Sequence, residues 1–524
     1  MSDTTFALPV PVLTLVVGVG SLGVYALARR AQKQRSRLPL PPGPKKFPLV
    51  GNLFDMPRER PWEAWHQFSQ KFDSDIVHLD IAGNSIVVLE SIEATRELFE
   101  RRSSLYSQRG RFPMVLELMD WSWSLGLLKY GDWWRRARKA MHDSFNVTAV
   151  KQFQPQQTKA AHALLRGLLQ DPRDIMSPIR HMAAALIMDV TYGIEVQPKN
   201  DPYIQVVTDA MHAFALTSVP GAFLVDTFPI LKYVPSWVPG AGFKRLAAEW
   251  RKSIQAMFDA PWEETNRQLD ADTAGQSFTA DALRALDNST TKNREAIEQE
   301  KYLIKTVAAN VYGAGADTTV ASLGWFVLAM LAYPEAQKKA QAELDEVLGH
   351  GNLPTFGDQP ALPYTTALVK EVLRWRAVTP LGVPHFVDVE DEYAGYRIPA
   401  GSTVIGNVWA LLRDENIYPD PIPFKPERFL RDGKLDPTVR DPDTIAFGFG
   451  RRICPGKTFA TTTVWINVAS MLATLNIEKC VNAEGKVVEP TYEAFPGLIS
   501  GPLAFECAIT PRSQQAAQAI QATL

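Results

Sequence analysis

Cysteine is scarce in this sequence, and neither sign of charge dominates. Only three cysteines occur in 524 residues, Cys454, Cys480 and Cys507, which excludes a disulfide-stapled scaffold and suits a reducing compartment. The formal net charge of −2 argues against nucleic acid as a partner. The eight histidines show no spacing typical of zinc sites. These absences direct attention to the surroundings of the individual cysteines.

The chain also lacks linkers, repeats and low-complexity tracts after its N-terminal region. Length alone would allow about three domains. The motifs described below are spread through residues 45–524, however, so we expect one large domain there. Helical periodicity predominates, for example over 158–169 and 333–348, which predicts a mainly α fold with small β-sheets. The predicted strands are short: 76–82, 85–89, 393–398 and 403–408.

The N-terminus carries the one long uncharged run. Residues 6–28 have no charge, and their 23 positions would span about 34 Å as a helix, enough to cross a hydrocarbon core. A cleaved signal peptide is the alternative, because 26–28 looks like a cleavage site. Asp3 precedes the run, however, and Arg29, Arg30 and Lys33 follow it. We therefore predict an uncleaved membrane anchor over 1–28, with the remainder cytosolic.

Two further features lie near this anchor. Residues 18–23 fit the dinucleotide fingerprint G-x-G-x-x-G, but no strand precedes them and no acidic residue follows about 20 positions on. Glycine is common in membrane helices, so we reject a nicotinamide site there. Residues 29–44 form a basic and proline-rich segment, in which 38–44 predict a stiff, extended hinge.

Residues 447–456, with the sequence FGFGRRICPG, surround Cys454 with features that suit a metal-bound thiolate. We expect Gly450 and Gly456 to adopt conformations that a β-carbon would forbid, so that amide groups point at the sulfur. Arg452 supplies a positive charge for an anion beside the metal, and Phe447 shields the sulfur from water. A helix beginning behind the loop would favour the thiolate further. The alternative is a buried structural cysteine.

A second motif lies within a long apolar helical pattern over about 302–332. Residues 311–320, VYGAGADTTV, place small residues before Asp317 and Thr318. Gly315 would let a cofactor approach the backbone, and the Thr318 hydroxyl can replace a helical hydrogen bond and open a water-sized groove. The alternative is a solvated helix turn.

A third set of residues is separated widely in sequence. Glu371 and Arg374 are three apart, so they share a helix face and can form an ion pair. Pro426–Phe429 then brings a further arginine, Arg428. Upstream, Trp134 and Arg138 lie one helical turn apart. The neighbouring Trp133 makes that register ambiguous, because it would face Ala137 instead of an arginine.

Together these motifs resemble the cytochrome P450 monooxygenases, in particular fungal microsomal members of the O-methylsterigmatocystin oxidoreductase-like type. The resemblance covers nearly the whole chain and implies the cytochrome P450 fold with one N-terminal transmembrane helix. It also implies haem with Cys454 as the axial iron ligand, and a buried network of Glu371, Arg374 and Arg428. The residues that the resemblance assigns to the haem and its propionates are Trp134, Arg138, His385, Arg109, Arg452, Phe447 and Gly315.

The resemblance further implies a mechanism and partners. Thr318 would hold bound oxygen while Asp317 relays protons from solvent, so that one oxygen atom of O2 enters a hydrophobic small molecule. The substrate would be a fungal secondary metabolite of terpenoid, polyketide or indole type. A haem-thiolate isomerase or dehydratase, and a non-catalytic haem sensor or membrane adaptor, are the alternatives. Retention of Asp317 and Thr318 argues against the isomerase.

The sequence contains no flavin or nicotinamide motif, so we expect electrons from NADPH through a separate cytochrome P450 reductase at the endoplasmic reticulum membrane. The candidate docking residues are basic: Arg135, Arg136, Lys139, Arg451 and Lys457. Ordinary solvated charge is the alternative. The apolar, proline-rich stretch 218–243 is expected to reach the membrane interface through Trp237, so that substrates enter from lipid. A loop packed on the core is the alternative.

Overall fold

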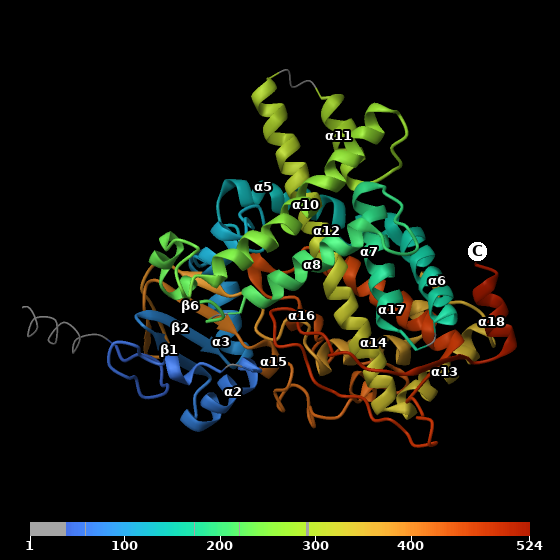
Figure 1. The fold of residues 1–524 in the computed structure, drawn as a ribbon. Helices are drawn as coiled ribbons and strands as arrows, with labels where there is room; N and C mark the ends of the chain where they lie inside the picture. Colours follow the sequence, from blue (N-terminus) through green and yellow to red (C-terminus); the bar gives the residue numbers. More distant parts are fainter. Residues whose placement is uncertain (1–37, 58, 172, 220, 290–292, 524) are drawn as a thin grey trace, which may run out of the picture.

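The computed structural model describes residues 38–57, 59–171, 173–219, 221–289 and 293–523. The predicted anchor 1–28 and the basic part of the hinge lie outside these residues. The fold is mainly helical, with one four-stranded sheet and three two-stranded sheets among the described residues. Figure 1 shows the four-stranded sheet and the first helices on one side of the molecule and most of the other helices opposite.

The α-helices in the first half of the chain are α2 (Pro61–Phe72), α3 (Ile92–Arg96), α4 (Ser103–Tyr106), α5 (Asp132–Phe145), α6 (Gln154–Gln170), α7 (Met176–Tyr192), α8 (Pro202–Thr217), α9 (Leu224–Thr227), α10 (Gly242–Asp270) and α11 (Phe278–Asp287). Those that follow are α12 (Arg294–Ala332), α13 (Pro334–Leu348), α14 (Pro363–Trp375), α15 (Val408–Leu411), α16 (Asp443–Ala446), α17 (Lys457–Thr474) and α18 (Gln514–Gln521).

Short 3₁₀ and π segments connect them. The 3₁₀ helices are η1 (Leu53–Asp55), η4 (Ala149–Phe153), η5 (Pro229–Tyr233), η6 (Phe356–Ala361), η7 (Pro426–Phe429) and η8 (Gly450–Arg452), and the π-helical turns are η2 (Glu97–Arg101) and η3 (Pro113–Leu118). The strands are β1 (Ile76–Ile81), β2 (Asn84–Leu89), β3 (His385–Val387), β4 (Asp391–Tyr393), β5 (Tyr396–Ile398), β6 (Ser402–Gly406), β7 (Leu430–Arg431), β8 (Lys434–Leu435), β9 (Leu475–Glu478) and β10 (Ala508–Pro511).

The four-stranded sheet has the order β1-β2-β6-β3. β1 and β2 form an antiparallel hairpin, β2 pairs with β6 in parallel, and β6 pairs with β3 in antiparallel fashion. The parallel pair brings residues 86–89 beside 403–406, more than 300 positions later in the chain. This long-range pairing places the segment that precedes β3 next to the N-terminal part of the fold.

Three sequence predictions about elements need correction. The predicted strand 393–398 is a hairpin, because Ala394 and Gly395 both have positive φ (51° and 77°) and form the turn between β4 and β5. The predicted strand 403–408 ends at Gly406, and Val408 begins α15. The central helix begins at Arg294, eight residues before the predicted start, because the Asn293 side chain accepts hydrogen bonds from the amides of Glu295 and Ala296.

Helix α12 forms the centre of the largest hydrophobic cluster, in which it packs against α7, α8, α14 and α17. Its N-terminal turns project from the body together with α11 (Figure 1). Within the described residues, α12 is the only helix long and apolar enough to cross a membrane, and 78% of its most apolar window is buried inside the protein. This burial identifies α12 as a core helix.

The described part of the hinge lies against the body of the protein. The amide of His78 in β1 donates to the Pro42 carbonyl (2.9 Å), and the amide of Arg397 in β5 donates to that of Pro39 (2.8 Å). A β-carbon on Gly43 would lie 2.0 Å from the carbonyl oxygen of His78. The proline-rich segment therefore continues the sheet edge at a distance that only glycine permits at position 43.

Candidate active site

A cavity of about 350 Å³ lies between α12 and the loop that carries Cys454. Cys454 sits three residues before α17, and its side chain is exposed to the cavity, which itself is surrounded by protein. On α12 the lining residues form one stripe with helical spacing: Asn310, Val311, Ala314, Gly315, Thr318, Thr319 and Ser322. Cys454 and Thr318 thus line the same cavity.

The loop around Cys454 is shaped by two glycines, of which the sequence analysis identified one. Gly450 has φ 57°, and a β-carbon there would lie 2.1 Å from the carbonyl oxygen of Phe99. The second is Gly448, with φ 79°. The prediction for Gly456 was wrong in its reason, since its φ of −89° is open to any residue. A β-carbon on Gly456 would meet no protein atom within 4 Å, and the residue lines the cavity.

The protonation of the Cys454 thiol reflects opposing effects. Burial raises its pKa. The backbone N–H groups of Gly456 and Lys457, together with the charges of Arg138 and Lys457, act in the opposite direction. Coordination to a metal ion deprotonates a thiol outright, and these donors are placed to stabilise the resulting thiolate.

Three arginines line the cavity without a carboxylate partner among the described residues: Arg109, Arg138 and Arg452. Arg109 donates to the carbonyls of Gly126, Val383 and Pro384, each at 2.8 Å. Burial lowers the pKa of each guanidinium, because it disfavours the charged form where no counter-ion is near. These arginines could therefore bind an anionic group in the cavity.

The aromatic neighbours of these arginines settle the register of α5. The Trp134 indole donates to the Leu125 carbonyl (3.2 Å) and lies under the Arg452 guanidinium, 4.4 Å from the ring centre. Trp133 instead stacks on Tyr302, outside the cavity lining, with the ring centres 5.7 Å apart. Trp134 and Arg138 both line the cavity, as predicted.

His385 is buried beside the same arginines. Its Nδ1 lies 2.7 Å from the Tyr106 carbonyl, so this nitrogen carries the proton, and its ring stacks on Phe99. Burial, together with the nearby charge of Arg109, lowers the pKa of His385 well below its usual value. A neutral ring in this tautomer accepts at Nε2, so donation to a carboxylate from that atom requires the imidazolium form.

Thr318 and Asp317, adjacent in sequence, lie in different places. Thr318 lines the cavity, and its hydroxyl donates to the Ala314 carbonyl (2.8 Å) while the helix continues unbroken. Asp317 lies outside the cavity lining, and burial raises the pKa of its carboxyl, against the opposing charges of Arg180 and His212. Asp317 thus adjoins α7 and α8, which carry those two residues.

Gly315 has a packing role that the sequence analysis did not predict. It lines the cavity, but a β-carbon there would lie 2.6 Å from Cδ1 of Ile187 in α7. The sequence analysis also missed Asn310. Its Oδ1 accepts from the Leu125 amide (2.7 Å) and its Nδ2 donates to the Thr306 carbonyl (2.7 Å), which ties the cavity loop to α12. The sequence did offer a signal for Asn310, which is a polar amide on an apolar helix two helical turns before Thr318.

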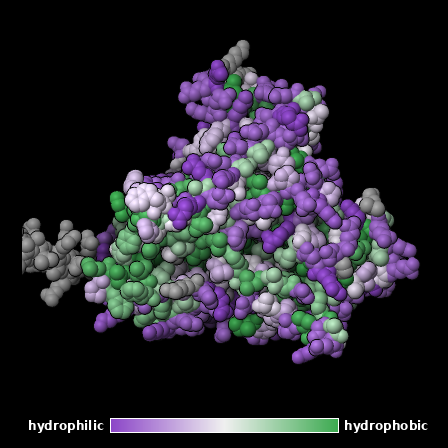
Figure 2. Space-filling view, viewed as in Figure 1, coloured by the Kyte–Doolittle hydropathy of each residue, from purple (hydrophilic) through white to green (hydrophobic). Residues whose placement is uncertain are grey.

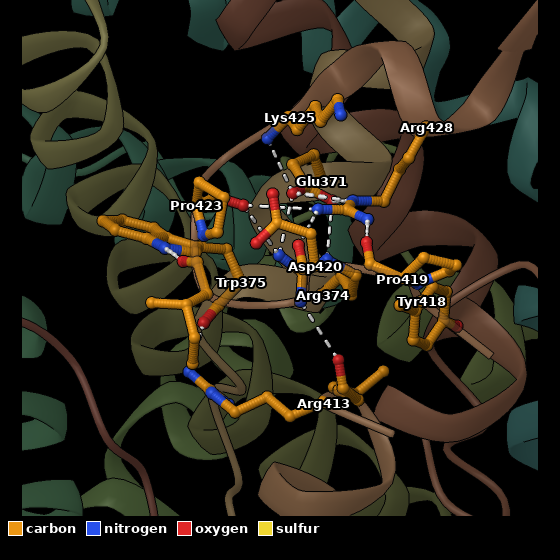
Figure 3. Close-up of polar contacts among 12 residues, drawn as sticks. Glu371, Arg374, Trp375, Arg413, Tyr418, Pro419, Asp420, Pro423, Lys425 and Arg428 are labelled. Atoms are coloured by element: carbon orange, nitrogen blue, oxygen red, sulfur yellow. Dashed lines mark hydrogen bonds and ion pairs between the residues drawn. The ribbon is translucent and has the colours of Figure 1, made fainter. Parts of the chain in front are cut away.

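The predicted Glu371–Arg374–Arg428 network is fully formed away from the cavity (Figure 3). Arg374 donates to both carboxylate oxygens of Glu371 (2.7 and 2.8 Å), and Arg428 Nε lies 3.1 Å from each. The Lys425 amide adds a further bond at 2.8 Å. The side chains of Glu371 and Arg374 are completely buried, and Arg428 is 6% exposed. This network joins α14 to η7 and so supports the loop that follows.

The residues present fit a haem. The Cys454 sulfur faces the cavity, and the arginines that line it have no carboxylate partner among the described residues. In the described part of the chain there is no cluster of three His, Cys, Asp or Glu side chains that could hold a metal. A macrocycle that supplies its own nitrogen ligands explains this arrangement. The family model described as cytochrome P450 matches residues 41–503.

The chain belongs to the cytochrome P450 family. It is 47% identical over 515 residues to cytochrome P450 monooxygenase 98 of Postia placenta, which covers 98% of this chain and 97% of the relative. It is 41% identical over 522 residues to cytochrome P450 monooxygenase ple1 of Rhodocybe pseudopiperita, covering 99% and 97%. Identity to the tryptamine 4-monooxygenase of Psilocybe cyanescens is 41% over 495 residues, covering 94% and 96%.

This P450 is accordingly a haem-thiolate monooxygenase of fungal type that uses O2, a small-molecule substrate and a redox partner. The predicted reductase-docking residues on its surface are largely paired with acids. Arg136 bridges Glu300 (2.6 Å), Lys139 bridges Asp143 (2.5 Å) and Lys457 bridges Asp443 (3.0 Å), and Arg135 pairs with Asp132. Arg451 differs, since it donates to the Tyr130 hydroxyl (3.0 Å).

Proposed function

We propose that this P450 hydroxylates a hydrophobic secondary metabolite of terpenoid, polyketide or indole type, with NADPH-derived electrons delivered by a membrane-bound cytochrome P450 reductase. The main support for this proposal is that Cys454 and the α12 stripe with Thr318 line the same cavity. Haem, when bound, would supply the oxygen-activating chemistry; Cys454 would bind its iron, and Arg109, Arg138 and Arg452 would hold its propionates. The relatives named as monooxygenases support the reaction class.

Asp317 and Thr318 have separate roles in this proposal. Thr318 presents its hydroxyl to the cavity, where it would donate a hydrogen bond to O2 in place of the one it now donates to the Ala314 carbonyl. Asp317 carries protons from the α7–α8 side, where Arg180 and His212 are its charged neighbours. A buried carboxyl with a raised pKa exchanges protons near neutral pH more readily than an ordinary aspartate.

The ligand assignment is tested by Cys454→Ser. The reduced carbonyl complex of the wild-type protein should show the red-shifted absorption band typical of thiolate ligation, and the variant should lose it. A variant that keeps the band would refute the assignment.

The oxygen-activating pair is tested by product formed per NADPH oxidised. Thr318→Ala should still consume oxygen and NADPH, with more flux to hydrogen peroxide. Asp317→Asn should slow turnover itself, by the roughly 10²–10⁴-fold typical of a lost general acid. Unchanged coupling and rate in both variants would favour the isomerase alternative, and the absence of any NADPH-dependent oxygen use would favour a haem sensor.

The domain organisation belongs to the same proposal: a membrane anchor over 1–28, a basic and proline-rich hinge over 29–44, and a monooxygenase domain over 45–524 that faces the cytosol from the endoplasmic reticulum. Exposed apolar side chains support it. Leu49, Phe54, Ile230 and Trp237 are 97%, 75%, 71% and 80% exposed, and Figure 2 shows apolar surface gathered on the side that carries β1 and β2.

Two contacts join the parts of this apolar surface. The Asn84 side chain donates to the Thr227 carbonyl (3.4 Å), and a β-carbon on Gly221 would lie 3.4 Å from the Met56 side chain. Deletion of 1–28 should release much of the protein from the bilayer, and adding Trp237→Ser should release more. Full resistance to carbonate extraction after the deletion would refute the anchor.

A further inference from the structure

Two of the segments that line the cavity are α12 and residues 378–383 before β3, and we take their side as the substrate side because α12 carries Thr318. Their lining side chains are apolar or carry a neutral hydroxyl or amide, for example Val311, Thr379 and Asn310. None of the hydrogen bonds among the described residues involves the Thr379 hydroxyl, although the residue is only partly exposed and faces the cavity. This hydroxyl is therefore free to bond a ligand.

The cavity lining, all of it within the described part of the chain, contains no aspartate and no glutamate. Two carboxyls on elements near the cavity do not line it. Asp226 accepts a hydrogen bond from the Met114 amide (2.9 Å), and Asp317 adjoins α7 and α8. The charged side chains that do line the cavity are cationic, Arg109, Arg138 and Arg452. Because the proposal above pairs these arginines with the haem propionates, what remains for a cationic ligand between α12 and residues 378–383 is a lining with no protein carboxylate to act as its counter-ion.

We propose, resting on the monooxygenase function above, that this site selects apolar molecules bearing a neutral hydroxyl or carbonyl group and rejects ammonium compounds, with Thr379 as a specificity-determining residue. Burial of an ammonium without a partner is costly. An amine can enter only after losing its proton, which at pH 7 weakens binding up to about a thousandfold for an amine pKa near 10. A neutral alcohol of the same shape carries no such cost.

Matched ligands test this on the purified holoenzyme by equilibrium dialysis, which needs no turnover. Tryptophol and tryptamine differ only in hydroxyl against ammonium, and decanol with decylamine gives a second skeleton. At pH 7 each alcohol should bind at least about tenfold more tightly than its amine. The apparent Kd of tryptamine should fall about tenfold per pH unit towards the amine pKa, because only the neutral form enters.

Variants at Thr379 locate the effect. Thr379→Val should weaken tryptophol binding by about five- to tenfold through the lost hydrogen bond, without weakening tryptamine. Thr379→Glu should invert the preference and favour tryptamine. Thr491→Glu places the same charge on an exposed residue and should change neither Kd.

The proposal is overturned if either amine binds as tightly as its alcohol at pH 7, if neither alcohol binds up to its solubility, or if Thr379→Glu leaves the preference unchanged. The proposed function fails separately. A wild-type protein without the thiolate-type carbonyl band refutes the haem-thiolate assignment, whatever the dialysis shows.

Discussion

Removal of the charge of Glu371 from its buried network should strongly destabilise this P450. Glu371→Gln keeps the shape of the side chain but leaves the Arg374 and Arg428 guanidinium groups, both almost fully buried, without their counter-charge. Breaking a buried pair in this way typically costs about 3–5 kcal/mol. The carbonyl oxygens of Leu412 and Pro419, which also accept from these arginines, satisfy donors but do not neutralise charge.

The expected shift in melting temperature follows from chain length. Unfolding entropy of roughly 2.1 cal/mol/K per residue gives about 1.1 kcal/mol/K for 524 residues. A loss of about 3–5 kcal/mol therefore lowers Tm by about 3–5 °C. Thermal unfolding followed by circular dichroism measures it, and the carbonyl band reports in parallel whether the cysteine loop keeps its haem.

Glu335→Gln is the matched control. Glu335 forms an ion pair with Lys338 at the same i, i+3 spacing as Glu371 with Arg374. The side chains of Glu335 and Lys338 are 75% and 67% exposed. Water screens such a pair, so its loss should leave Tm nearly unchanged. A Tm shift for Glu371→Gln no larger than that of the control would refute the argument that burial decides the effect.

Further predictions address other parts of the fold. Burial raises the pKa of Asp226 to about 7, so between about pH 4 and pH 7 the native state keeps a proton that the unfolded chain has lost, and stability falls as pH rises through this window. Asp226→Asn should flatten this dependence and raise Tm at pH 8; identical Tm–pH curves would contradict it. Gly450→Ala should abolish haem incorporation, because the added β-carbon would clash with the Phe99 carbonyl oxygen. The control Gly433→Ala is also at positive φ (73°) but has no atom within 4 Å, so it should lower Tm only slightly. Equal effects of the two variants would show that the clash with Phe99 is not the cause. Arg451→Glu should raise the KM for the reductase at low salt but not at high salt, because salt screens exposed charges. A KM that does not respond to salt would exclude a docking role for Arg451.

Local patterns in the sequence were sufficient for much of the site. The cysteine loop, the α12 motif and the Glu371–Arg374 pair are short-range patterns, so their spacing alone indicated a thiolate, a cavity-facing threonine and a shared helix face. The predicted opening of the helix at Thr318 was wrong, because α12 continues unbroken through it. The sequence also predicted Trp134 over Trp133, because only Trp134 shares a face with Arg138. The hydrophobic periodicity predicted the mainly helical class for the same reason, since it depends on neighbours within a few residues.

Long-range packing decided the rest. Gly456 was expected to need a special backbone conformation, but the loop turns at Gly448 and Gly450, where Phe99 approaches from a distant segment. Asp317 and Thr318 are neighbours in sequence, yet the rotation of 100° per residue in a helix sends one towards α7 and α8 and the other into the cavity. A sequence fixes which residues share a helix face, whereas the charge of the cavity wall depends on which faces the tertiary structure turns inward.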